Sequence, residues 1–390
     1  MTIKKILQEL EKFIYEINTE SRLARVGLKK EQKIAPIVKK YQWLFSLPTI
    51  NFVKKSQLLF FELSESFLYS KTASLEDKIE TFFNKSEVEI DGEKIAYHNL
   101  EPLISKTADF KKRERLQKAG QQVVKKANPQ MLLMLKTALK SLEKDLGFIG
   151  EIDFYQKKKT IDYSQFYRLV QEINSQLQGI YQEKMGKFVQ ENLNVVWKNL
   201  NSCHLSYLRG LNHFDHFFPK GQLMPVFEFS MKDLGFILKK QTNIKIDTAE
   251  RPGKNPRAVC YTTKVPEEIH LIIKPIGGFY DFTAFFHEGG HAEHYSNMSA
   301  NLPFAYRYLA ASHASSELFS FLFESLTRNP LWLEKYLNLP KKIAKQVAYE
   351  SEMANLCLLI RYLGKFSYEY QLFSDGDFAK GPQLYSQTLT

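Results

Sequence analysis

The sequence predicts a mainly α-helical protein that carries a small β element. Apolar residues recur three and four positions apart over most of the 390 residues, which is the period of amphipathic helices. Two short stretches, residues 87–97 and 257–274, carry the signals of β-strands instead. Hydrophobic residues make up 44% of the chain, which supplies a large core. We expect two lobes, residues 1–200 and residues 201–390.

The first 85 residues predict helices, with a break at Pro48 and a further helix over residues 58–69. A hairpin follows, because Asp91-Gly92 lies between two alternating runs and is a favoured two-residue hairpin turn. The hairpin carries no reactive side chain. We therefore assign it a structural role.

The middle of the chain predicts two long amphipathic helices, residues 110–147 and residues 163–193, joined by a loop around Gly150. The pattern then changes. Residues 257–263 and 268–274 predict two strands, and a helix follows them.

The strongest chemical signal is the run His287-Glu288-Gly289-Gly290-His291, the H-E-x-x-H pattern typical of zinc metallopeptidases. Two histidines four apart on a helix lie on one face, so both imidazoles can reach one metal ion. Glu288 can then act as general base on a water in the metal's open position. Mid-helix glycine costs about 1 kcal/mol relative to alanine. We therefore expect Gly289 and Gly290 where a neighbouring helix or a substrate comes close.

A catalytic zinc ion takes three protein ligands and keeps one open position. A second helix is predicted to begin downstream, capped by Ser315 or Ser316. Glu317 in its first turn can complete a His-His-Glu site. Glu324, on the same face, can hydrogen-bond to one of the ligands without binding the metal itself. An acid stabilised by the helix dipole is the alternative interpretation of Glu317. We expect one Zn²⁺ ion at this site.

Other histidines are weaker candidates. His294 lies about 10 Å along the helix axis from the first motif histidine, which favours a supporting or packing role. His313 competes with the glutamate as third ligand. Packing and hydrogen bonding explain His204, His213 and His216 best, because no third ligand lies near them in the sequence.

The strand before the motif has two open interpretations. It offers an edge along which an extended peptide forms backbone hydrogen bonds, or it packs beneath the following helix. On the first interpretation we expect Ile272, Gly277 and Gly278 to contact the substrate.

Charge and composition restrict the rival classes of protein. The net charge of +11 comes from lysine pairs spread along predicted helices, and no nucleic-acid-binding module is recognisable. A basic, nucleic-acid-associated helical protein remains the rival interpretation. No stretch is apolar enough to span a membrane, and the N-terminal segment predicts a charged helix, not a signal peptide. With three widely spaced cysteines, Cys203, Cys260 and Cys357, a cytoplasmic protein with reduced thiols is expected.

With these residues in place, the chain resembles the thimet oligopeptidase / oligoendopeptidase F family of gluzincins. The resemblance rests on the Gly277-Gly278 pair, on His287–His294, and on the helix that holds Glu317 and Glu324. It implies that Glu317 is the third zinc ligand and that Glu324 orients a zinc histidine. It also implies a largely helical, zincin-like body whose active-site cleft lies beside the β element and admits only short, unfolded peptides.

The sequence departs from this family at one point. The family's oxyanion donor is a tyrosine in a Gly/Tyr-rich loop well beyond the zinc helices, and no such loop precedes Thr390. Tyr385 does not lie in that sequence context. We therefore expect a chain truncated at its C-terminus. Either it is a zinc-dependent oligopeptidase, or it is a catalytically impaired, zinc-bearing relative that binds peptides.

Overall fold

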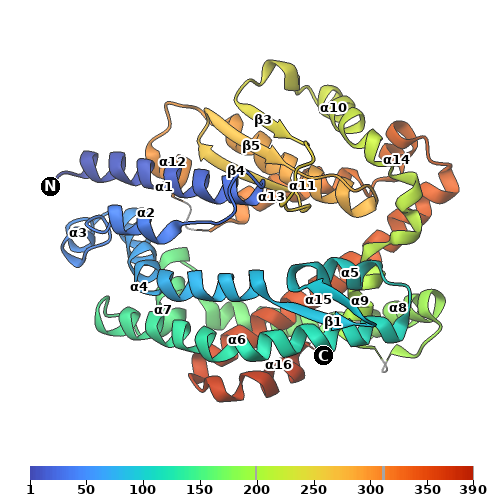
Figure 1. Cartoon of the computed structure of the whole chain (residues 1–390), viewed down its shortest axis with the longest axis horizontal. Coiled ribbons are helices and arrows are strands. Elements are labelled where there is room, and N and C mark those ends of the chain that lie inside the picture. Colours follow the sequence, from blue (N-terminus) through green and yellow to red (C-terminus); the bar gives the residue numbers. More distant parts are fainter. Residues whose placement is uncertain (198–199, 310–311, 390) are drawn as a thin grey trace. The chain divides into compact units, whose positions relative to one another are not determined.

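The computed structural model describes residues 1–197, 200–309 and 312–389. Most of these residues form α-helices, and the strands among them belong to one two-stranded and one three-stranded sheet (Figure 1). The predicted mainly α-helical class with a small β element is confirmed. No helix among the described residues combines the length and the apolar character that crossing a bilayer requires.

The chain forms two compact units, each built from two segments. Unit 1 comprises residues 1–73 and 213–348, and unit 2 comprises residues 74–212 and 349–390. Two long helices, α4 (Gln57–Lys85) and α15 (Lys341–Asp375), each begin in one unit and end in the other. The expected lobes, residues 1–200 and 201–390, are single continuous segments, so the compact units divide the chain at other positions.

The remaining helices of unit 1 include three that meet through aromatic side chains. The remaining helices are α1 (Ile3–Arg25), α2 (Ile34–Lys40), α3 (Leu47–Phe52), α10 (Leu223–Asp233), α11 (Phe279–Ser296), α12 (Phe304–Tyr308), α13 (Ala314–Leu326) and α14 (Pro330–Leu337). Phe227 of α10 meets Phe285 and Phe286 of α11 edge to face, with ring centroids 4.8 and 5.1 Å apart. Phe286 meets Trp332 of α14 in the same manner at 5.2 Å. These contacts fix one side of α11, the helix that carries the motif.

Unit 1 also holds the three-stranded sheet, formed by β3 (Ile244–Asp247), β4 (Val259–Lys264) and β5 (Glu268–Ile272). The order is β3-β5-β4, with β3 parallel and β4 antiparallel to β5. The two predicted strands are confirmed as β4 and β5, whereas β3 was not predicted, because its short alternating run has no tight-turn pair such as Asp-Gly beside it.

The sheet order corrects one prediction. The second predicted strand, β5, is central, so it has neighbours along both edges and no edge for a peptide. Ile272 pairs with Asp247 on one side and Val259 on the other, and its side chain is 2% exposed. The expected contact between Ile272 and an extended substrate is therefore wrong.

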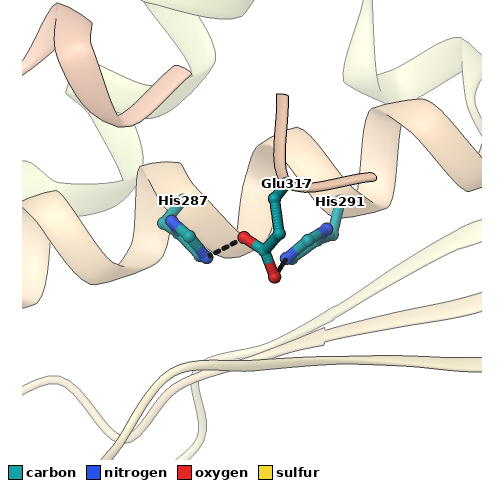
Figure 2. Close-up of side chains that lie close together, drawn as sticks. All are labelled: His287, His291 and Glu317. Atoms are coloured by element: carbon teal, nitrogen blue, oxygen red, sulfur yellow. Dashed lines mark ion pairs between the residues drawn. The ribbon is translucent and has the colours of Figure 1, made fainter. Parts of the chain in front are cut away.

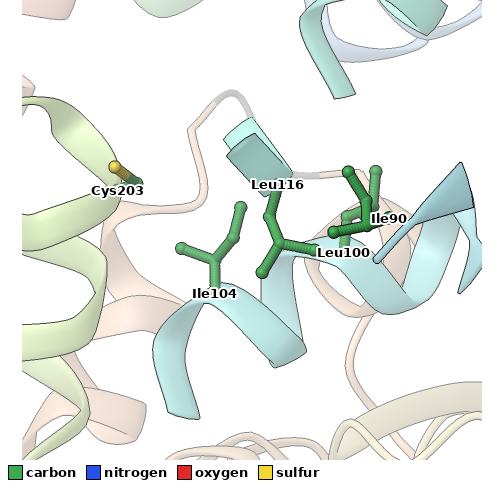
Figure 3. Packing of buried hydrophobic residues seen from close by; sticks show 5 residues of the cluster. All are labelled: Ile90, Leu100, Ile104, Leu116 and Cys203. Atoms are coloured by element: carbon green, nitrogen blue, oxygen red, sulfur yellow. The ribbon is translucent and has the colours of Figure 1, made fainter. Parts of the chain in front are cut away.

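Unit 2 contains the predicted hairpin together with helices of very different lengths. These elements are β1 (Glu87–Ile90), β2 (Glu93–Ala96), α5 (Leu100–Lys106), α6 (Phe110–Lys144), α7 (Gly150–Lys159), α8 (Tyr163–Leu193), α9 (Ser202–Gly210) and α16 (Gly381–Leu389). Asp91 and Gly92 both have positive φ, 54° and 81°, as a tight hairpin turn requires. The hairpin packs through Ile90 against Leu100, Ile104, Leu116 and Cys203, which form a buried apolar cluster (Figure 3).

The segment around Gly150 differs from the expected loop, because α7 begins there. Its first turn carries Glu151 and Asp153, and its last turn carries three lysines. This charge order stabilises a helix through its dipole. The Asp153 carboxylate also accepts a hydrogen bond from the free N–H of Ile149, at 3.2 Å.

Candidate metal centre

A glycine turn sets the start of α11. Gly277 and Gly278 have φ values of 91° and 101°, a region that favours glycine. The Asp281 carboxylate accepts the N–H of Gly277 at 2.8 Å, and Gly278 donates its N–H to the carbonyl of Phe218 at 2.9 Å. A Cβ on Gly278 would lie 2.5 Å from the carboxylate of Asp215. The turn is thus built by internal contacts, and a role of both glycines in substrate binding stays a prediction.

The structure brings His287, His291 and Glu317 together (Figure 2). Glu317 extends from the first turn of α13 toward the two histidines on one face of α11. Its Oε2 lies 3.4 Å from Nε2 of His287, and its Oε1 lies 3.7 Å from Nε2 of His291. One candidate ligand atom from each residue lies within 4.8 Å of the others. Among the described residues, this is the one group of three metal-ligating side chains that lie so close together.

Glycine allows this meeting of two helices. A Cβ at Gly290 would lie 2.5 Å from the carbonyl oxygen of Phe319 and 2.6 Å from Cα of Ser320. α13 therefore touches α11 backbone to backbone. A Cβ at Gly289 would lie 2.7 Å from the ring of Phe227 in α10. Both glycines thus face neighbouring helices, which is one of the two explanations expected from the sequence.

Two further contacts orient the cluster. Nδ1 of His287 lies 2.7 Å from Oε2 of Glu324, which also forms an ion pair with Arg328. Since an ionised carboxylate only accepts, this contact places a proton on Nδ1 and turns Nε2 toward Glu317. The hydroxyl of Ser320, a fully buried residue, lies 2.8 Å from the carbonyl oxygen of Glu317 and 2.9 Å from its Oε2, so its one proton is shared between these two acceptors.

The electrostatics of the cluster favour a cation. Burial alone would lower the pKa of His287, but the hydrogen bond to Glu324 and the charges of Glu288 and Glu317 raise it overall. Burial lowers the pKa of His291, against the charge of Glu317. Two imidazole nitrogens and a carboxylate are donors that zinc takes, and tetrahedral zinc ligands lie about 3.4 Å apart. The residues present therefore fit a zinc ion.

Glu288 is held beside this cluster by the sheet. Its Oε2 accepts the backbone N–H of Cys260 in β4 at 2.8 Å. Burial raises the pKa of Glu288, while the Cys260 N–H and the charge of His287 oppose the rise. No residue pattern marks Cys260, because its backbone N–H makes the contact. Ser320 was also missed, although its place one turn after Glu317 is a usable signal.

The other histidines lie outside the metal cluster. His294 stacks on Phe319, with ring centroids 4.5 Å apart, and burial lowers its pKa. His313 is the exposed N-cap residue of α13, and its carbonyl accepts the N–H of Glu317 at 2.9 Å. The helix therefore begins before Ser315, which was expected to cap it. In unit 2, His204 is buried and accepts a hydrogen bond from Arg113.

No family model and no curated protein matches the sequence. Solved structures do match the fold. A structure described as an oligoendopeptidase F from Bacillus anthracis str. Ames is similar with a TM-score of 0.55 and 15% identity, over 91% of this chain and 68% of that one. PZ peptidase A, solved with an inhibitor, is similar with a TM-score of 0.54 and 15% identity, over 94% of this chain and 67% of that one. The chain therefore has the fold of these two structures and spans about two thirds of their length.

Proposed function

We propose that this protein is a zinc-dependent peptidase that hydrolyses short peptides. One observation carries the proposal: His287, His291 and Glu317 converge from two helices, with Glu288 beside them. The named activity of the structures that share the fold supports the same class of reaction. The proposed substrates are short peptides, because both structures bear peptidase names.

The residues that would hold the ion are the two imidazoles and the Glu317 carboxylate. When bound, zinc would polarise the scissile carbonyl and lower the pKa of a water molecule. Glu324 holds His287 in the tautomer that presents Nε2, and Ser320 holds the Glu317 carboxylate.

Glu288 acts as general base in this proposal. The Cys260 N–H binds Oε2 and so fixes the carboxylate, while Oε1 can take a proton from the attacking water. Burial makes the carboxylate a better base, because it raises the pKa of Glu288 toward neutral pH. The same group can then pass the proton to the leaving amine.

We further propose that the protein acts in the cytoplasm. Its three cysteines are free thiols in the structure, as reducing conditions would keep them. Nucleic acid and membrane are not proposed as partners. The second candidate is a zinc-bearing relative that binds peptides and cleaves them poorly.

The test combines metal analysis with a quenched-peptide assay. We expect one zinc per chain and cleavage that a chelator abolishes. Glu288→Gln should keep the zinc and lose about 10²- to 10⁴-fold in kcat. Glu267→Gln, which removes an exposed carboxylate of the same unit, is the control and should match the parent. Zinc without cleavage supports the second candidate. A protein that binds no zinc contradicts both.

A further inference from the structure

Helix α1 contacts β4, the strand whose Cys260 N–H binds Glu288 (Figure 1). Asn18 donates its side-chain N–H to the carbonyl of Thr262 at 3.0 Å, and Asn255 donates its N–H to the carbonyl of Arg25 at 3.0 Å. The later residues of α1 therefore contact earlier residues of the segment 255–262, so the helix and the segment run in opposite directions. This segment, the stretch of chain between the two contacts, includes Cys260, whose N–H binds Glu288.

Two arginines share the face of α1 that contacts β4. Arg22 and Arg25 follow Asn18 by four and seven positions, and such residues lie above one another on a helix. Their charges act on a group of the sheet. Burial raises the pKa of Tyr261 in β4, and the charges of Arg25 and Arg22 oppose that rise.

Neither arginine has an anionic partner in the described part of the chain. Both side chains are half-buried, and the Nε atom of each is shielded from water without a hydrogen-bond acceptor. The other half-buried arginines of unit 1 each face a carboxylate, namely Arg251 with Asp247, Arg307 with Glu11, and Arg328 with Glu324.

Without a bound anion, this arrangement of two arginines costs free energy. Two like charges on one helix face repel each other, and a shielded N–H without an acceptor costs free energy. A guanidinium binds a carboxylate through two parallel hydrogen bonds. A carboxylate placed between Arg22 and Arg25 would supply the opposite charge to both guanidinium groups.

We propose that Arg22 and Arg25 form a binding site for a carboxylate of the peptide substrate, close to Glu288. This inference rests on the proposed function, because the anion is taken to belong to the chain that Glu288 attacks. The carboxylate is either the C-terminus of the peptide or an acidic side chain. The site makes the enzyme selective for peptides that carry a negative charge near the bond that is cleaved.

The test measures binding separately from turnover. Three N-terminally dansylated peptides serve as probes: pentaalanine with a free C-terminus, its C-terminal amide, and an amide with one alanine replaced by glutamate. Fluorescence anisotropy gives their Kd values for the zinc-loaded Glu288→Gln protein. The same protein is then measured with Arg22→Gln and Arg25→Gln, singly and together. Lys4→Gln, on the same helix and exposed, is the charge-matched control, and thermal unfolding shows whether each variant is folded.

We expect at least one carboxylate-bearing peptide to bind about 10- to 100-fold tighter than the neutral amide. The peptide that shows this advantage identifies the source of the carboxylate. The double variant should bind all three peptides equally, and Lys4→Gln should keep the advantage. The inference is overturned if the protein with both arginines binds the three peptides with equal Kd values. It is also overturned if the folded double variant still binds a carboxylate-bearing peptide more tightly than the neutral amide.

Cleavage assays with intact Glu288 separate this inference from the proposed function. If the neutral amide is cleaved and no peptide shows a carboxylate advantage, the peptidase proposal stands and the arginine site fails. If the advantage is present and no peptide is cleaved, the arginine site stands and the peptidase proposal fails.

Discussion

Gly290 and Ser320 bring two helices into direct backbone contact, because a Cβ at Gly290 would lie 2.6 Å from Cα of Ser320. This contact sets the distance between α11 and α13. The two motif histidines lie on one helix, and Glu317 lies on the other. The spacing therefore decides whether the carboxylate reaches the imidazoles.

Replacement of Gly290 by alanine should push the two helices apart, because the new methyl group meets backbone atoms that cannot rotate away. We expect a loss of about 1–3 kcal/mol in the free energy of unfolding, together with weaker zinc binding. Chemical denaturation and chelator competition measure these two effects.

Gly179→Ala is the matched control for this substitution. Gly179 lies in α8, and a Cβ there would meet nothing within 4 Å. Alanine should stabilise that helix by up to about 1 kcal/mol. A Gly290→Ala protein with parental stability and zinc affinity would show that the helices can separate without consequence.

Helix α11, which carries the motif, shows which features can be predicted from the sequence. Spacing alone places His287 and His291 on one face, and a single acid in the first turn of the next helix points to Glu317. The long helices were also predictable, since α8 begins and ends at the predicted residues 163 and 193. In both cases the information is local, a period or a fixed offset along one helix.

Other features depend on partners far away in the sequence. The place of β5 in the centre of its sheet follows from β3, a four-residue strand whose Ile244 pairs with the distant Ile269. The contact that fixes Glu288 uses the backbone of Cys260, which leaves no trace in residue type. Asn18 of α1 meets β4 across 244 positions of the sequence. Such relationships are set by tertiary packing.

Ser320→Ala should weaken zinc binding. The hydroxyl of Ser320 shares its proton between the carbonyl oxygen of Glu317, at 2.8 Å, and Oε2 of the same residue, at 2.9 Å. Its removal takes away one contact that holds the carboxylate beside the histidines. The loss of such a supporting contact typically costs about 10- to 100-fold in metal affinity. Competition with a chromophoric chelator measures the Kd for zinc.

Ser325→Ala is the control on the same helix, because Ser325 is exposed and its hydroxyl contacts the backbone of Leu322. It should leave the Kd for zinc unchanged. If Ser320→Ala and Ser325→Ala bind zinc equally well, the hydroxyl of Ser320 has no part in positioning Glu317.

Glu324→Ala should lower zinc affinity by a similar factor of about 10 to 100, for a different reason. Without its carboxylate, Nδ1 of His287 loses the acceptor that fixes the tautomer and the ring orientation. Arg328 also loses its partner, so some stability is lost as well. Glu324→Gln keeps an acceptor for Nδ1 and should lie between the parent and the alanine variant. If Glu324→Gln binds zinc as weakly as Glu324→Ala, the negative charge of Glu324 matters for zinc affinity and the orientation of the His287 ring does not.

The buried His204 should make stability depend on pH. Its Nδ1 accepts a hydrogen bond from Arg113 at 3.1 Å, so the ring is neutral. Burial and the charge of Arg113 lower the pKa of His204 below its ordinary value, although Glu114 opposes them. A group whose pKa is lowered by folding contributes stability above its unfolded pKa, about 6.5. That contribution disappears as the pH falls through the lower, folded pKa. The free energy of unfolding should therefore decrease between pH 7 and pH 5.

His204→Gln should remove this part of the pH dependence, because glutamine accepts from Arg113 and does not titrate. Denaturation with urea at pH 7 and at pH 5 gives the change in the free energy of unfolding for each protein. His98→Gln, an exposed histidine of the same unit, is the control and should keep the parental change. Other groups titrate in this range too, but they contribute equally to both proteins, so the difference between parent and variant isolates His204. A His204→Gln protein with the same pH dependence as the parent would mean that folding does not shift the pKa of His204, which contradicts the effect expected from burial and from Arg113.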